Sequence, residues 1–227
     1  MTQTLAITDF DFAAEPADAD CLITVWLPEI ELVIATFEPD DRSSAFLTAG
    51  LRMGARSKTL KKFNLMAVVE KAGYSRSTFF RLFEGYTGFL LKCYQLSCFL
   101  VTKVYARHLV QQQFSLEEFC KFTMDVFYGG ACTVSHEILQ TLWRENNLSH
   151  AEFHPHLADL APLIQSYLNL NPQTQHLQVD LEELEGVLKS LDLDMLNARL
   201  EDNAQWGTPF YYKKLTKMLQ GYLSACG

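Results

Sequence analysis

The sequence predicts an all-α protein, and three observations lead to that fold class. Apolar residues recur three and four positions apart, as on one face of a helix, along most of the 227-residue chain. Several of these patterns begin directly after a Ser, Thr or Asn, the residue types that cap helices. From Tyr86 to the carboxyl terminus, no segment shows the alternation of apolar and polar residues that is typical of a strand.

Residues 1–40 are expected to form an acidic amino-terminal extension, since residues 1–41 hold ten Asp and Glu and no Lys or Arg. Residues 21–27 alternate in part and are compatible with a strand, whereas residues 28–37 show helical spacing. The pattern leaves open a hairpin or a strand followed by a helix. The extension is either a packing or solubility appendage or an acidic arm that competes with DNA for a basic surface.

A first helix is expected over residues 41–54, with Asp41 or Ser43 as its N-cap, and it should brace the two helices that follow. Its inward positions, at helical spacing, are Phe46, Leu47, Gly50, Leu51 and Met53. The connector after it is basic, and basic side chains there are well placed for phosphate contacts. Its positive residues are Arg56, Lys58, Lys61 and Lys62.

The segment from Asn64 to Phe83 predicts two short helices joined by a turn at Gly73. Asn64 stands directly before the first helix, where its side-chain oxygen can accept a hydrogen bond from a first-turn N–H. Gly73 can adopt φ > 0 without a Cβ penalty, so it can end that helix. The apolar face of the first helix consists of Leu65, Val68, Val69 and Ala72.

Ser75 is expected to cap the second short helix, in which Phe79, Leu82 and Phe83 point inward. A short helix that exposes two arginines and small hydroxyl side chains suits the major groove of DNA. Its outward face carries Arg76, Ser77, Phe80 and Arg81. The residues expected to contact DNA are Lys58, Lys61, Lys62, Asn64, Ser75, Arg76, Ser77, Thr78, Phe80 and Arg81.

The distribution of charge supports nucleic-acid binding, although the net charge of the chain is −8. Between Arg42 and Lys92, ten Lys and Arg stand against two acids, so this stretch carries +8 and the remainder −16. A basic block inside an acidic protein is the electrostatic footprint of a DNA-binding module. The alternative interpretation is an ordinary solvated basic face.

Helices are also expected along the rest of the chain. One runs from Tyr86 to about Gln112, and the next, opened by a Ser115–Glu118 capping box, stops near Gly129–Gly130. Ser135 should cap a helix that ends at Asn146–Asn147. Ser149–Glu152 forms a second capping box, after which Pro155, Pro162 and Pro172 punctuate the segment. Apolar stripes at Leu181, Leu184, Leu188 and Leu191, and at Leu215, Leu219 and Tyr222 after a Thr208–Pro209 cap, complete the chain.

Three histidines, His150, His154 and His156, lie within seven residues. The first two have the i, i+4 spacing at which a helix can present two metal ligands. Pro155 disturbs that geometry and no Cys or fourth ligand is near, so we expect a surface turn and no metal site. No Walker loop, GxGxxG or nucleophile elbow occurs, so we expect no catalytic residue, no cofactor and no enzymatic activity.

The cysteines and the hydropathy indicate a reducing, cytoplasmic location. The six cysteines form no CxxC pair, and most stand among apolar helical residues, which predicts buried free thiols. No run approaches the roughly 18 to 20 apolar residues that cross a bilayer. The amino terminus lacks the basic region of a secretory signal. We therefore expect a cytoplasmic protein without a membrane partner.

The run AVVEKAGYSRSTFFRLFEGYTGFLL resembles the amino-terminal helix-turn-helix of TetR-type transcriptional regulators. The sequence departs from the family at Phe80, where a phosphate-contacting Tyr is usual, at Tyr86, where a Lys is usual, and at Ser77, where a Gly is usual. The matching positions are Val68, Ala72, Gly73, Ser75, Thr78, Phe79 and Phe83.

This resemblance implies a three-helix DNA-binding domain over residues 41–88 and a helical ligand-binding and dimerisation domain over residues 89–227. In the family, the second region encloses a ligand cavity, and its last two long helices build the dimer interface. The residues that we assign to a cavity are Phe119, Phe122, Phe127, His136, Leu139 and Trp143.

A weaker similarity links TFFRLFEGYTGFLL, followed by LWRENNLSHAEF, to the subgroup of that family that regulates unsaturated fatty-acid synthesis. The shared marks, with no Lys at Tyr86, are Arg144, Glu145, Ser149, Ala151 and Phe153. It favours a small apolar effector of the fatty acyl class. The expected function is a ligand-responsive, homodimeric repressor that binds a double-stranded DNA operator and is released or tuned by this effector. The alternative is a TetR-like helical protein that has lost specific DNA binding and acts through protein–protein contacts, as Phe80, Tyr86 and the acidic arm would allow.

Overall fold

The computed structural model describes residues 34, 40–54, 64–133, 136–146, 149–201 and 203–227. Within these ranges the regular secondary structure is entirely helical, with no strand, so the predicted all-α fold class is confirmed. The predictions for Lys58, Lys61 and Lys62, for a cap at Ser135 and, apart from residues 34 and 40, for the acidic extension fall on residues outside the described ranges.

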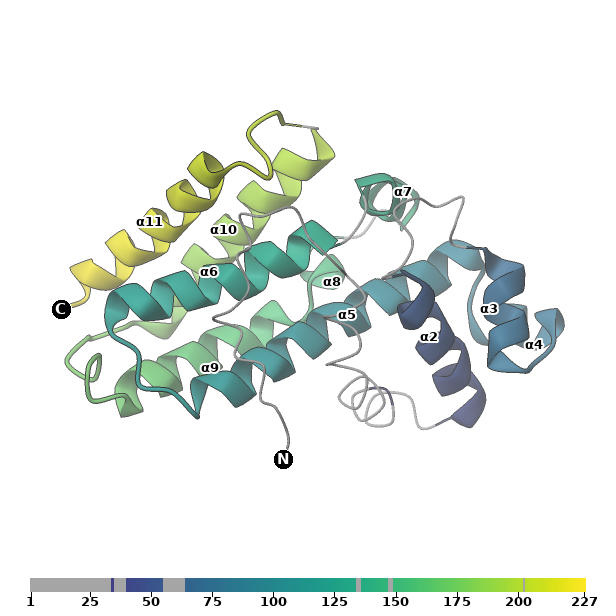
Figure 1. The fold of residues 1–227 in the computed structure, drawn as a ribbon, viewed down its shortest axis with the longest axis horizontal. Coiled ribbons are helices and arrows are strands. Elements are labelled where there is room, and N and C mark those ends of the chain that lie inside the picture. The colour runs from purple at the N-terminus through teal and green to yellow at the C-terminus, as the bar shows by residue number, and fades with distance from the viewer. Residues whose placement is uncertain (1–33, 35–39, 55–63, 134–135, 147–148, 202) are drawn as a thin grey trace.

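The described chain forms ten helices, and Figure 1 shows α2, α3 and α4 at one end of the molecule, with α5 running from them toward the other end. The helices are α2 (Asp41–Gly54), α3 (Leu65–Ala72), α4 (Arg76–Leu82), α5 (Tyr86–Leu109), α6 (Leu116–Thr133), α7 (His136–Asn146), α8 (His150–Phe153), α9 (Leu157–Leu170), α10 (Leu181–Leu200) and α11 (Pro209–Ala225).

Most of the predicted helix ends are confirmed by their hydrogen bonds. The Asn64 side chain accepts a bond of 2.8 Å from the Met66 amide, and Gly73 is left-handed with φ of 75°. The Ser75 hydroxyl accepts from the Thr78 amide at 3.1 Å. Both predicted capping boxes are present, and Thr208 caps α11. These signals act within one helical turn, which is why the sequence alone predicts them.

Four predicted features differ from the structure. The cap of α2 is Asp40, whose carboxylate accepts a 3.1 Å bond from the Ser43 amide, rather than Asp41 or Ser43. Helix α5 ends at Leu109 rather than near Gln112. Helix α6 continues through Gly129–Gly130 to Thr133, and α9 continues through Pro162. In the last two cases, tertiary packing outweighs a local helix penalty of about 1 kcal/mol per Gly and about 3 kcal/mol for Pro.

Buried apolar side chains form two clusters, and α5 belongs to both. The amino-terminal cluster joins α2, α3, α4, α7, α8, most of α5 and Leu196 of α10, and it includes Phe46, Val68, Phe79, Phe89, Leu142 and Phe153. The carboxyl-terminal cluster joins the end of α5 with α6, α9, α10 and α11, and it includes Tyr105, Phe119, Ile164, Leu188 and Leu215. The predicted domain boundary at residues 88 and 89 falls inside α5.

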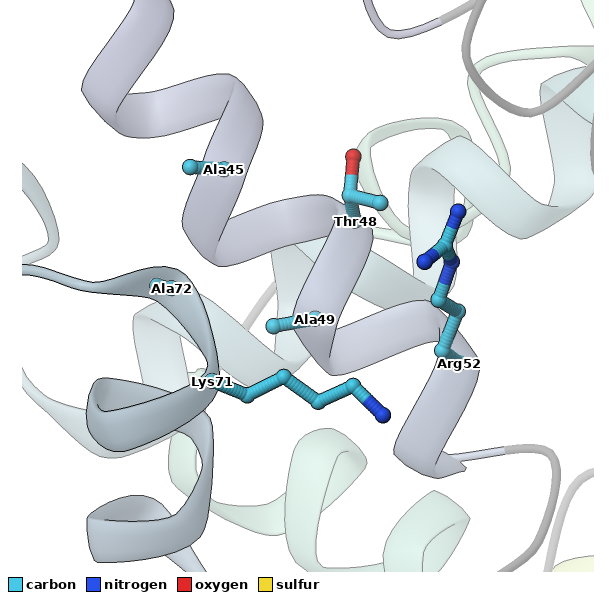
Figure 2. A pocket seen from close by; sticks show the side chains of 6 residues that line it. All are labelled: Ala45, Thr48, Ala49, Arg52, Lys71 and Ala72. Atoms are coloured by element: carbon cyan, nitrogen blue, oxygen red, sulfur yellow. The ribbon is translucent and has the colours of Figure 1, made fainter.

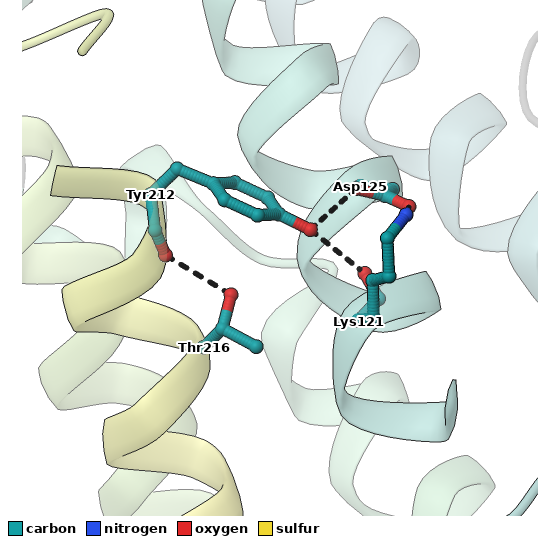
Figure 3. Close-up of polar contacts among 4 residues, drawn as sticks. All are labelled: Lys121, Asp125, Tyr212 and Thr216. Atoms are coloured by element: carbon teal, nitrogen blue, oxygen red, sulfur yellow. Dashed lines mark hydrogen bonds and ion pairs between the residues drawn. The ribbon is translucent and has the colours of Figure 1, made fainter. Parts of the chain in front are cut away.

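Tyrosine hydroxyls fix α11 against its neighbours. Figure 3 shows Tyr212 of α11 reaching Asp125 and the carbonyl oxygen of Lys121 on α6. The Lys121 ammonium also pairs with the Asp125 carboxylate at 2.7 Å. On the other side, the Tyr211 hydroxyl donates to the Asp194 carbonyl oxygen of α10 at 2.9 Å. Helix α11 is therefore held by directional bonds in addition to its apolar stripe.

Most of the apolar stripe residues of α10 and α11 pack inside the chain itself. The buried ones are Leu184, Leu188 and Leu191 on α10 and Leu215 and Leu219 on α11. The outward faces of these helices expose four large apolar side chains, which are Leu181, from the predicted stripe, and Leu193, Phe210 and Met218. Among the helices described, none is both long enough and apolar enough to span a membrane.

Gly50 permits the close approach of α2 to α5. A Cβ atom at Gly50 would lie 2.6 Å from Phe89 Cζ and 2.8 Å from Cys93 Sγ, and both of these side chains are buried. We expect Gly50→Ala to lower the free energy of unfolding by about 1–3 kcal/mol through overpacking, as measured by urea denaturation.

The matched control is Gly88→Ala, where the nearest atom to an added Cβ is the Glu84 Cβ at 3.9 Å. This variant should be neutral or gain up to about 1 kcal/mol from helix propensity. If the two variants lost the same stability, Gly50 would not be explained by close packing.

Candidate functional site

Helix α4 presents two different faces, as its sequence predicts. Phe79 is fully buried and Phe83, its C-cap, is nearly so. On the opposite side, Phe80 keeps 44% of its surface exposed. The exposed residues of this helix are Arg76, Ser77, Phe80 and Arg81, while Thr78 is half-buried. The predicted outward face is confirmed.

Phe79 holds α4 in place through aromatic contacts with two other helices and with the C-cap of α4. Its ring centroid lies 5.4 Å from that of Phe46 on α2, 5.0 Å from that of Phe89 on α5 and 5.2 Å from that of Phe83. Such tilted and edge-on pairs add about 0.5–1.5 kcal/mol each to the burial of their surface. The outward face therefore rests on a rigid support.

The hydroxyl groups of α4 and the Arg76 guanidinium gather at its amino terminus. The Ser75 hydroxyl lies 2.8 Å from that of Ser77 and 2.9 Å from that of Thr78. The Arg76 guanidinium stands 5.4 Å from the centre of the Phe80 ring. This stacking orders the arginine while its N–H groups can still donate, and guanidinium donors match phosphates and guanine edges in geometry.

A cleft between α2 and α3 adds two cations that the sequence analysis did not assign to a site. It has a volume of about 240 Å³, and Figure 2 shows the side chains that line it, including Arg52 on α2 and Lys71 on α3. Its other lining residues are Ala45, Thr48, Ala49 and Ala72. Both cations belong to the basic stretch between Arg42 and Lys92. Its positive charge was the only feature of the sequence that could have indicated this cleft. A small, positive cleft of this kind suits an anion such as a phosphate.

The six residues predicted to line a ligand cavity lie in different parts of the fold. Phe119 and Phe122 belong to the carboxyl-terminal cluster and Phe127 packs against it, where Tyr105 stacks on Phe122 at 5.5 Å. Leu139 belongs to the amino-terminal cluster and Trp143 packs against that cluster, whereas His136 is half-buried at the start of α7. The structure does not bring these six side chains together.

The three clustered histidines do not form the expected surface turn. His154 and His156 are each only 5% exposed, and His150 is half-buried, because this turn packs against α5 and α10. Sequence reasoning also missed their charged partner. Asp192 of α10 accepts from His150 Nε2 at 2.6 Å and contacts His154 Nδ1 with the same carboxylate oxygen.

Opposing effects set the protonation of Asp192, whose side chain is 16% exposed. Burial would raise the pKa of Asp192, but the hydrogen bonds and charges of His150 and His154 outweigh it and hold that pKa well below its usual range. Burial lowers the pKa of His156 to about 4, so this imidazole is neutral near pH 7. The cluster thus combines a carboxylate with neighbouring imidazoles.

No protein-family model matches this chain, and no curated protein matches it. The interpretation of both sites therefore depends on their own geometry and charge.

The two faces of α4 predict opposite outcomes for neighbouring phenylalanines. Phe79→Ala should cost about 3–5 kcal/mol of unfolding free energy, since it empties a packed aromatic site. Phe80→Ala should change it by about 0.5 kcal/mol or less, as is usual for an exposed side chain. Urea denaturation measures the free energy of unfolding of both variants, which can be compared directly if their m-values are the same. Equal losses of unfolding free energy would contradict the assignment of the two faces.

Proposed function

We propose that this protein is a homodimeric DNA-binding transcriptional regulator, in which α3, Gly73 and α4 act as a helix-turn-helix and α4 enters the major groove. The observation that carries the proposal is the outward face of α4. It places Arg76, Ser77 and Arg81 in solvent on a helix whose other face is anchored by Phe79. This arrangement supports recognition of base edges by the first turn and of phosphates further along.

Charge around α4 supports the same proposal. Arg52 and Lys71 line the cleft between α2 and α3, and both belong to the stretch that carries +8. Cations beside a groove-reading helix neutralise phosphates and fix its register. Helix α3 also exposes Met66, and Tyr74 follows it, so apolar contacts with sugar or thymine methyl groups can accompany the charged ones.

Control by a small apolar effector of the fatty acyl class belongs to the proposal as well. Its support is the resemblance of the sequence to TetR-type regulators, together with the amount of aromatic surface in the second half of the chain. Phe119, Phe122 and Phe127 all lie in or against the carboxyl-terminal cluster. We therefore assign the effector to a site beside these three residues and not to Leu139 and Trp143, which lie in or against the amino-terminal cluster. Repression released by the effector is the proposed direction of control.

The first experiment is an unbiased selection of bound fragments from the host genome, followed by titration of the selected duplex against salt. If the +8 block engages the phosphate backbone, log K should fall with log salt at a slope on the order of −4 to −8 for a dimer. A flat salt response or the absence of any enriched sequence would favour the alternative, a helical protein that acts through protein–protein contacts.

Arg76 and Arg81 should play different roles. Arg76 lies in the first turn of α4, so Arg76→Ala should weaken operator binding and relax preference at one base pair by about 1–3 kcal/mol. Arg81 lies in the last turn, so Arg81→Ala should weaken operator and random DNA in similar proportion. Competition binding with base-substituted duplexes measures both effects, and unchanged preference in Arg76→Ala would place the base contact elsewhere.

A two-fold dimer would set two copies of α4 about one DNA turn apart, roughly 34–36 Å. We expect α10 and α11 to form its interface through their exposed apolar side chains. Light scattering should report a dimer for the protein and a monomer for Met218→Glu. Met66→Glu is the matched control, because Met66 is 55% exposed on α3 and Met218 is 43% exposed on α11. A monomeric wild-type protein would contradict the proposed assembly.

A further inference from the structure

Three potential metal ligands converge where α8 meets α10. The atoms are His150 Nε2, His154 Nδ1 and an Asp192 carboxylate oxygen, and they lie within 4.8 Å of one another. Asp192 is 42 residues from His150 in sequence, so the fold, and not local spacing, assembles the set. Two imidazoles and one carboxylate are a common ligand set for divalent transition metals.

The single turn of α8 is built to present its two histidines on one side. Ser149 and Glu152 close a capping box at its start, and the His154 amide donates to the His150 carbonyl oxygen at 2.8 Å. Pro155 follows directly and disfavours the helical conformation for His154, which leaves the helix with φ of −120° and ψ of 63°. Its Nδ1 contacts the Asp192 carboxylate. The i, i+4 pair therefore survives although the helix stops.

We propose that His150, His154 and Asp192 bind one divalent transition metal of the zinc class and leave one coordination position open. Zinc bonds of about 2.0–2.1 Å in a tetrahedron separate ligand atoms by about 3.3 Å. His150 Nε2 and the Asp192 oxygen stand 2.6 Å apart and must separate by less than about 1 Å to make room for the cation. No two of the three ligand atoms are more than 4.8 Å apart, so side-chain shifts of about 1.5 Å or less place all three around one cation. The open position takes water or a donor atom of a small ligand.

Tyr94 of α5 supports this assignment from outside the ligand set. Its hydroxyl contacts His154 Nε2, the ring nitrogen that faces away from Asp192. A metal on Nδ1 requires the proton on Nε2, and the Tyr94 oxygen is placed to accept that hydrogen bond. Metal-bound histidines usually have an oxygen acceptor of this kind, which fixes the tautomer and the orientation of the ring.

A buried atom beside the cluster also lacks a partner. His156 Nδ1 is buried and makes no hydrogen bond within the described residues, and its ring centroid lies 5.5 Å from that of His154. Buried polar nitrogens are normally paired. A water molecule on the open metal position is a partner of the type that this nitrogen needs.

The proposal is independent of DNA binding, because its test measures the cation on the protein alone. The chelator-treated full chain is titrated with Co²⁺ and its visible absorption is recorded, and Zn²⁺ is then added as competitor. One equivalent of Co²⁺ per chain should produce a saturating tetrahedral band that Zn²⁺ abolishes. Zinc should also raise the thermal midpoint of the apo-protein, since a ligand that binds only the folded state stabilises it.

Asp192→Asn keeps the shape of the side chain and should remove the band, and so should His150→Ala at a half-buried position. Tyr94→Phe should weaken cobalt binding by about 10- to 100-fold while retaining the band. His176→Ala, at an exposed histidine away from the cluster, is the control and should bind like wild type.

Circular dichroism shows whether each variant folds. If one of Asp192→Asn and His150→Ala does not fold, the cobalt binding of the other tests the proposal. No band in the wild-type protein would overturn the proposal and leave a hydrogen-bonded histidine–aspartate cluster. Undiminished binding in folded Asp192→Asn and His150→Ala would likewise overturn it.

Discussion

The packing of Phe79 is the constraint on which the amino-terminal half of the molecule depends. Its ring contacts one residue from α2, one from α5 and the C-cap of its own helix, so the orientation of α4 is set by its buried face. A seven-residue helix has little stability of its own in water. The exposed arginines and serines can hold a defined geometry only because this apolar anchor supplies the missing free energy.

Local signals in the sequence predicted much of this half, and tertiary packing decided where they failed. Asn64, Gly73 and Ser75 act through bonds to residues at most three positions away, so their roles follow from composition and spacing. Pro162 and Gly129 are local breakers inside continuous helices. Their penalties are outweighed by burial of neighbours such as Ala161 and Tyr128, which no local pattern reveals.

The outward face of α4 and the histidine–aspartate cluster differ in the same way in how far the sequence predicts them. The outward face of α4 follows from helical periodicity, since the buried positions of Phe79 and Phe83 leave the arginines on the other side. The histidine–aspartate cluster does not, because Asp192 comes from α10 and no rule links its position in sequence to that of α8. A half-buried carboxylate loses hydration and needs hydrogen-bond donors to remain ionised, which explains why Asp192 faces both His150 and His154.

Helix α5 has a mechanical consequence for the whole chain. At 1.5 Å per residue its 24 residues extend about 36 Å, and it is part of both apolar clusters. A stiff rod embedded in two cores cannot rotate or slide in one without repacking the other. Cutting the chain at residue 88 would leave Phe89, Leu90 and Cys93 without the surface that covers them, so the halves are expected to melt as one cooperative unit.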